Sequence, residues 1–180
     1  MFRKLFRYTA IVAAFLLLLF GLFLVHASLT YYDPEPKQSV WFSDIPDTIA
    51  AGDTLTAITW NIGYAGLGSN MDFFYDGGRK VRDTKPRTLQ NLDSITSILT
   101  QHSHRDFFLL QEVDFGSRRT YSINQLEPIS RALNRQNSVG FNYDVLFVPI
   151  PLLNPMGRVL SGVVTYSQPV PETSIRYQYP

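Results

Sequence analysis

The longest uninterrupted apolar stretch of the chain lies near its N-terminus. Residues 8–25 carry no charge and follow a basic segment, residues 1–7. A run of roughly 18 residues can span a bilayer, whereas the apolar region of a cleaved signal is usually about 7–15 residues long. The pattern therefore favours a transmembrane anchor over residues 8–27, with a signal sequence as the alternative. The basic residues should stay in the cytoplasm while the remainder is exported to the periplasmic or extracellular side. The protein is secreted if residues 1–27 are cleaved.

The first half of the remaining chain alternates strand-like and helix-like patterns. Residues 28–52 have few periodic apolar positions and two proline-containing turns, which indicate a linker before a domain at 53–180. Residues 55–62 are expected to form a strand, and apolar residues on both its faces favour an interior position. A long loop follows, and the three- and four-residue apolar spacing of 86–102 then predicts a helix. Residues 107–113 form a second apolar strand.

The second half is richer in strands. A short helix is expected around 124–135, followed by strands at 143–148, 159–166 and 174–179. The strand–helix–strand unit at the start of the domain should be a right-handed crossover with parallel strands. The sequence therefore predicts an α/β architecture with a mixed sheet.

The composition excludes some kinds of functional site and favours others. The 180 residues include no cysteine, which excludes disulfides, thiolate metal sites and a cysteine nucleophile. The net charge of +1 gives no electrostatic support for strong nucleic-acid binding. An aromatic content of 14% favours a β-rich core.

Two of the predicted strands end on polar residues that suit a metal ion. Asn61 closes the first strand and Glu112 lies near the end of the second. Ligands of α/β sheets bind at the carboxyl ends of the strands, so the two side chains should converge there. Amide and carboxylate oxygens suit Mg²⁺, which completes its coordination with water and substrate phosphate. His102 and His104 precede the second strand and should lie at the opposite end of the sheet.

The residues around these strand ends resemble a known family. Thr59-Trp60-Asn61-Ile62-Gly63, then Leu110-Gln111-Glu112-Val113, then Gly162-Val163-Val164-Thr165-Tyr166-Ser167 follow the order of the endonuclease/exonuclease/phosphatase superfamily, which has the deoxyribonuclease-I-like fold. The resemblance covers about residues 53–180 and corresponds to the first half of that domain. It implies a four-layered α/β sandwich and hydrolysis of phosphoester bonds with Mg²⁺ or Mn²⁺. Such motifs are short, and it is their joint occurrence that supports the resemblance.

The resemblance also suggests roles for individual residues. Glu112 would be the metal ligand, and Asn61 would help to hold the metal or the phosphate. Gln111 would be structural. Arg118 and Arg119 follow the second strand in a loop at the same edge, where a guanidinium group suits a substrate phosphate. Two solvated loop arginines are an equally good interpretation.

The chain departs from the family in its second half. The family's Gly-Asp-x-Asn and Ser-Asp-His motifs are absent, and no histidine follows His104. We therefore expect a truncated N-terminal half that would leave an apolar sheet face uncovered and would not catalyse hydrolysis by itself.

Three functions remain open from the sequence. The first is an exported, membrane-tethered phosphoester hydrolase acting on nucleic acid, a phospholipid head group or a small phosphate ester, with no obligate protein partner. The second is a catalytically inactive, membrane-anchored binding module with the same fold. The third is an unrelated α/β domain with chance motif matches, which predicts that the side chains of Asn61 and Glu112 lie more than about 10 Å apart.

Overall fold

The structure is a computed structural model that describes residues 2–178. The chain divides into two compact units, one up to Asp33 and one from Pro34, and each is described by itself. The first unit contains a single helix, α1 (Phe2–Leu29), that buries none of its residues. Among the described residues, α1 is the one helix long and apolar enough to cross a membrane. A membrane anchor and a signal sequence meet this criterion alike, so the choice between them stays a prediction, as does the side of the membrane on which the domain lies.

The second unit is built on a four-stranded sheet with the order β2-β3-β5-β4. Strands β2 (Ala57–Asn61) and β3 (Phe107–Asp114) pair in parallel, as the crossover argument predicts. Strands β5 (Gly157–Ser167) and β4 (Gln136–Val148) add antiparallel neighbours, which confirms the mixed sheet.

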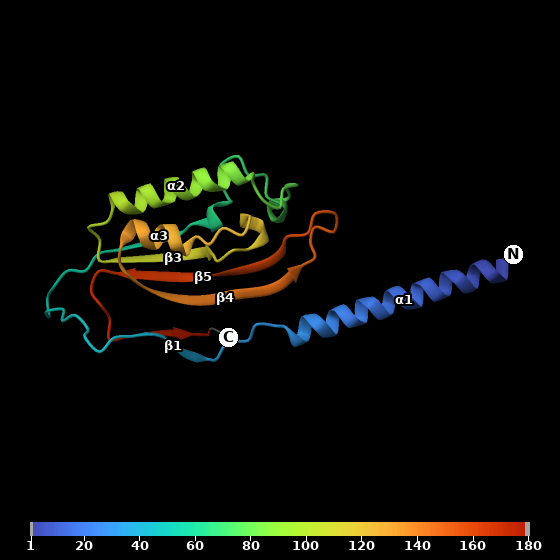
Figure 1. Cartoon of the computed structure of the whole chain (residues 1–180), viewed down its shortest axis with the longest axis horizontal. Helices are drawn as coiled ribbons and strands as arrows, with labels where there is room; N and C mark the ends of the chain where they lie inside the picture. Colours follow the sequence, from blue (N-terminus) through green and yellow to red (C-terminus); the bar gives the residue numbers. More distant parts are fainter. Residues whose placement is uncertain (1, 179–180) are drawn as a thin grey trace. The chain divides into compact units, whose positions relative to one another are not determined.

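Two helices cover one face of this sheet (Figure 1). They are α2 (Lys85–Gln101) and α3 (Leu126–Leu133). The helix α2 begins where the Thr84 side chain accepts a hydrogen bond from the Arg87 N–H, and a proline occupies its first turn. Its apolar stripe packs on the sheet, and the buried cluster includes Leu92, Ile95, Leu99, Phe108, Leu110, Ile129, Leu133, Val164 and Tyr166.

A small second sheet lies across the other face. It consists of β1 (Lys37–Phe42) and β6 (Thr173–Tyr177), which pair antiparallel. β1 also contacts β4. The second unit thus has a helix layer, a sheet and a two-stranded ribbon, a mixed α/β arrangement consistent with a sandwich. The four-layered form stays a prediction.

Three expectations about elements need correction. The expected linker 28–52 contains β1, which the pattern missed because the strand is short and its register shifts between Ser39 and Trp41. β2 is an edge strand and not an interior one: Ile58 and Trp60 pack on the core, but the other face of β2 is exposed. β4 begins at Gln136, well before the expected 143, because its first part is polar and lacks an apolar repeat.

The remaining elements follow the expectation closely. The expected strand 174–179 corresponds to β6, with residue 179 outside the described range. Three short 3₁₀ helices connect the main elements: η1 (Gly63–Ala65), η2 (Phe74–Asp76) and η3 (Arg118–Thr120). η1 and η3 directly follow the ends of β2 and β3, at the sheet edge where the candidate residues lie.

Candidate functional site

Asn61 and Glu112 meet at the ends of the parallel strands. The Asn61 amide Nδ2 donates a hydrogen bond of 2.8 Å to Glu112 Oε1. This contact contradicts the separation of more than about 10 Å expected for chance motif matches. The described residues give the other carboxylate oxygen, Oε2, no hydrogen-bond partner. The Glu112 side chain is therefore held at one oxygen and available at the other.

A β-bulge in β3 brings Glu112 into this position. Between Leu110 and Val113 the register of β3 against β5 shifts, so β3 has one more residue than its partner strand. Glu112 has a φ of 53°, a left-handed conformation that is unfavourable for a residue with a Cβ atom. Leu110 and Val113 are both fully buried, whereas a regular strand would place residue 112 on the same face as Leu110. The bulge turns the carboxylate out of the core and toward Asn61.

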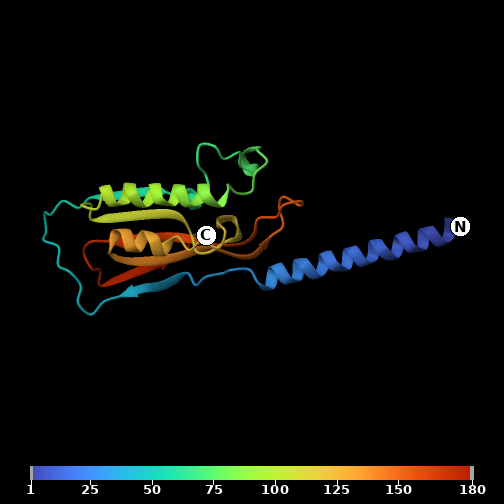
Figure 2. The same cartoon turned by 45° about the horizontal axis from the view of Figure 1, so that its top comes forward.

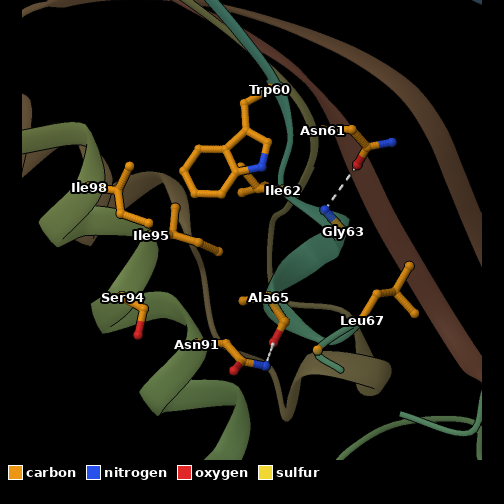
Figure 3. Close-up of a pocket in the computed structure, with 11 residues that line it drawn as sticks. Trp60, Asn61, Ile62, Gly63, Ala65, Leu67, Asn91, Ser94, Ile95 and Ile98 are labelled. Carbon is orange, nitrogen blue, oxygen red and sulfur yellow. Dashed lines mark hydrogen bonds between the residues drawn. The ribbon is translucent and has the colours of Figure 1, made fainter. Parts of the chain in front are cut away.

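The chain after Asn61 forms a left-handed turn that is tied to the same side chain. Asn61 Oδ1 accepts a hydrogen bond of 2.9 Å from the Gly63 N–H (Figure 3). Gly63, Tyr64 and Ala65 all have positive φ values, of 52°, 43° and 53°. The Asn61 amide therefore uses its oxygen to fix this turn and its nitrogen to orient Glu112.

Two side chains anchor this turn from the helix layer. Asn91 of α2 donates a hydrogen bond of 3.0 Å to the carbonyl oxygen of Ala65, which Figure 3 shows. Gln125, fully buried before α3, donates one of 2.5 Å to the carbonyl oxygen of Tyr64. Gln125 Oε1 also accepts a hydrogen bond from the Asp114 N–H. One buried amide thus joins the η1 turn to the end of β3.

Asp114 organises the loop that carries the two candidate arginines. Its fully buried carboxylate accepts hydrogen bonds from the Ser117 N–H, the Thr120 hydroxyl and Arg119 Nε. In the ion pair, Arg119 Nε lies 2.8 Å from Asp114 Oδ2. The Arg119 side chain is 11% exposed and the Asp114 side chain 0%. Asp114 directly follows the Leu110–Val113 motif, but no sequence pattern indicated that its side chain would be a buried anchor.

Arg119 and Arg118 play different parts. The Arg119 guanidinium lies 3.8 Å from the centre of the Tyr64 ring, so the loop arginine is held between a carboxylate and an aromatic face. Arg118 is exposed, and its stem crosses Gly157, where a Cβ would sit 2.6 Å from Arg118 Cδ. Both follow β3 at the Glu112 edge, as expected. Contact with a substrate stays a prediction for each.

Tyr64 is a residue that sequence reasoning missed. Its side chain is only 2% exposed, and its hydroxyl is buried without a hydrogen-bond partner among the described residues. Burial raises the pKa of this phenol well above its usual value, Arg119 opposes that rise, and Glu112 and Asp114 add to it. Tyr64 therefore stays protonated beside the Glu112 edge, and its hydroxyl keeps its proton available for a hydrogen bond there.

The two histidines lie where the sequence predicted. His102 and His104 follow α2 and precede β3, whereas Glu112 lies near the end of β3. Both side chains are exposed. They are thus at the opposite end of the sheet from the candidate site.

A pocket of about 410 Å³ opens between β2 and α2, and Asn61 is one of its lining residues. Within the pocket Trp60 points toward Ile95 and Ile98, whereas the Asn61 side chain points away from α2 (Figure 3). Glu112 does not line this pocket. The pocket is mainly apolar and has no charged side chain, so it offers no positive charge to pair with a phosphate.

The side-chain oxygens at this edge suit a magnesium ion held by few protein ligands better than one enclosed by protein ligands. No group of three or more His, Asp or Glu side chains in residues 2–178 is placed to hold a metal. Glu112 offers one free carboxylate oxygen, and Mg²⁺ commonly takes one or two protein carboxylates and keeps several waters. The Asn61 oxygen is engaged by Gly63, so its role as a ligand stays a prediction.

Comparisons with known proteins add little to this geometry. No family model matches the chain, and no curated protein matches it significantly. A solved structure of an endonuclease/exonuclease/phosphatase family protein from Leptotrichia buccalis C-1013-b aligns with a TM-score of 0.34 and 14% identity. The alignment covers 63% of this chain and 38% of that one. A similarity this distant carries no argument about the family, metal, substrate or activity of this chain.

Proposed function

We propose that this chain carries part of the active site of a metal-dependent phosphoester hydrolase, whether phosphodiesterase, nuclease or phosphatase. The observation that carries the proposal is the carboxylate of Glu112, turned out of the core by a bulge and oriented by Asn61. A left-handed conformation at a non-glycine residue is unfavourable and is typically retained where function requires it.

Each residue has a distinct role in this proposal. Glu112 holds Mg²⁺ or Mn²⁺ through the oxygen that Asn61 leaves free, and Asn61 positions the carboxylate. When bound, such an ion polarises a phosphoryl oxygen and stabilises the leaving group. Arg118 is exposed at the same edge and pairs with the phosphate of the substrate. Arg119, held by Asp114, supplies a fixed positive charge.

The location of the domain is also part of the proposal. The helix α1 is long and apolar enough to tether the protein to a membrane, and the basic residues before it favour a cytoplasmic N-terminus. The site-bearing unit would then face the periplasm or the extracellular space. Its substrate would be a nucleic acid, a phospholipid head group or a small phosphate ester in that compartment.

A binding module without catalysis is the second candidate. It is favoured by the donor set, because the described residues provide one free carboxylate and no histidine near it. Such a module would bind a metal–phosphate complex through the same Glu112 and Arg118 but would not turn it over.

Phosphate binding tests the site directly. We would titrate the full chain in detergent with inorganic phosphate by calorimetry, with and without Mg²⁺. Wild-type protein and Glu127→Gln, a matched change at an exposed surface pair, should show Mg²⁺-dependent binding that Glu112→Gln loses. Binding that is indifferent to Mg²⁺ or to Glu112 refutes the proposal. Release of p-nitrophenol from bis(p-nitrophenyl) phosphate would then exclude the binding module, since only a hydrolase releases it.

A further inference from the structure

The connection between β4 and β5 exposes consecutive leucines at its tip. Leu152 is 86% exposed and Leu153 is 101% exposed, and Ile150 nearby is 41% exposed. We call these three residues the apolar tip. In Figures 1 and 2 this connection projects beyond the ends of the strands. Isolated exposed leucines are common on protein surfaces, but adjacent, fully exposed ones on a projecting loop are not.

The base of the same hairpin is well packed, so the tip is held outward by a defined structure. Val148 and Met156 are 7% and 4% exposed and belong to a buried cluster with Val81 and Val159. The N–H of Met156 donates a hydrogen bond to the carbonyl oxygen of Ile150 (3.1 Å), which closes the loop above this cluster. The tip residues could reach the cluster only if this base were disrupted.

The charges around the tip suit a lipid surface. Residues 145–157 contain no charged side chain. The first charges on either side are Asp144, which is partly buried, and Arg158, which is exposed. The exposed Arg118 lies against Gly157 at the base of the hairpin. An apolar projection with arginines behind it matches the acyl–head-group boundary of a bilayer that contains anionic lipids.

We infer that the apolar tip inserts into the interface of a lipid bilayer as a second membrane contact, separate from α1. A convex projection has no groove to receive a peptide, which favours the bilayer over a protein partner. The chain itself brings the domain near a membrane if α1 crosses one. Residues 30–36 connect α1 to β1 and reach at most roughly 25 Å when fully extended.

The contact has a consequence for the candidate site. The tip lies at the same end of the sheet as Glu112, because the end of β4 and the start of β5 lie beside the end of β3. Insertion would bring this edge close to the lipid head groups, where phosphoesters are concentrated. This consequence rests on the proposed function, whereas insertion of the tip does not.

The absence of cysteine makes a direct test possible. The full chain would be reconstituted into vesicles of phosphatidylcholine and phosphatidylserine in equal parts, with a single Leu153→Cys substitution labelled with the fluorophore NBD. Ser97→Cys, an exposed position on α2, is the matched control. We expect blue-shifted emission from position 153 and strong quenching by nitroxide-labelled lipids, with neither effect at position 97. Adding Leu152→Ser should reduce the quenching at 153.

The alternatives give different results. Equal quenching at positions 153 and 97 overturns the inference. So does a blue shift at 153 that appears without lipid and grows with protein concentration, which would indicate contact with a second copy of the chain. Glu112→Gln should leave quenching at position 153 unchanged. Failure of the tip to insert is therefore distinguishable from failure of the metal site, which the phosphate titration reports.

Discussion

Asn61 Nδ2 and Glu112 Oε1 lie 2.8 Å apart although 51 positions separate the two residues in the chain. Parallel pairing of β2 with β3 brings the strand ends together, and the bulge in β3 then turns Glu112 toward Asn61. The same amide holds the left-handed turn that follows. The pairing of the strands and the bulge in the backbone thus bring the two side chains together, in addition to the hydrogen bond between them.

The first prediction concerns the strained backbone at Glu112. Its φ of 53° disfavours any residue with a Cβ. Glu112→Gly should therefore be more stable than Glu112→Ala by about 1 kcal/mol in urea unfolding of the chain in detergent. At the neighbouring Gln111, which does not have positive φ, the order should reverse, with glycine less stable than alanine by roughly 0.5–1 kcal/mol. The same order at both positions would show that Glu112 is not strained.

The second prediction separates positioning from ligation at Asn61. Asn61→Ala removes the hydrogen bond to Glu112 and should weaken Mn²⁺ binding by roughly 10–100-fold, the usual effect of losing a partner that orients a ligand. Gln111→Ala is the control, because Gln111 bonds Thr59 and the Leu109 carbonyl instead of Glu112. Equal Mn²⁺ affinity in both variants and wild type would exclude a role for Asn61.

The third prediction contrasts a buried ion pair with an exposed one. Asp114→Ala leaves the largely buried Arg119 without its partner and should cost about 3 kcal/mol or more in the free energy of unfolding. Arg131→Ala breaks an exposed pair, in which the Arg131 side chain is 75% exposed and that of Glu127 70%. This change should lower the free energy of unfolding by no more than about 0.5 kcal/mol. Similar losses in the two variants would mean that Asp114 does not anchor the loop.

The fourth prediction follows from two buried phenols. Burial raises the pKa of Tyr166 to about 12, opposed by a hydrogen bond with Ser130, and burial raises that of Tyr64 further. Folding favours the protonated form, so this stabilisation is complete below the unfolded-state pKa of about 10 and is lost as the pH rises through the folded-state value. Unfolding free energy should fall between about pH 10 and pH 12.

Phenylalanine variants check this assignment. Tyr166→Phe should make the fall above pH 10 shallower, since one of the groups that ionise on unfolding is gone. Tyrosine absorbance at 295 nm should show ionisation of the buried phenols only as the chain unfolds. A slope that is unaffected by Tyr166→Phe and by Tyr64→Phe would contradict the prediction.

The sequence predicted the elements that have strong patterns. The apolar repeat of α2 and the apolar run of β3 were sufficient to predict these two elements. The crossover rule then predicted that β2 pairs in parallel with β3. β1 and the first part of β4 were missed because their stability comes from pairing with β6 and β5 and not from an apolar repeat of their own. The edge position of β2 could not be predicted from the sequence of that strand alone, because apolar residues on both faces occur in interior and edge strands alike.

The approach of Asn61 to Glu112 was predictable from the sequence, but the geometry of their contact was not. Asn61 and Glu112 were identified from their positions at strand ends. The bulge was not, because a left-handed glutamate leaves no mark in the sequence, unlike the glycine usually found there. The buried roles of Tyr64, Asp114 and Gln125 depend on contacts between segments far apart in the chain.

Mn²⁺ binding reports on Glu112 without requiring turnover. Free Mn²⁺ would be measured by electron paramagnetic resonance during titration of the full chain in detergent, for wild type, Glu112→Gln and Glu127→Gln. We expect Glu127→Gln to bind Mn²⁺ like wild type and Glu112→Gln to bind it at least about 10-fold more weakly. Equal Mn²⁺ affinity in all three proteins would contradict this expectation.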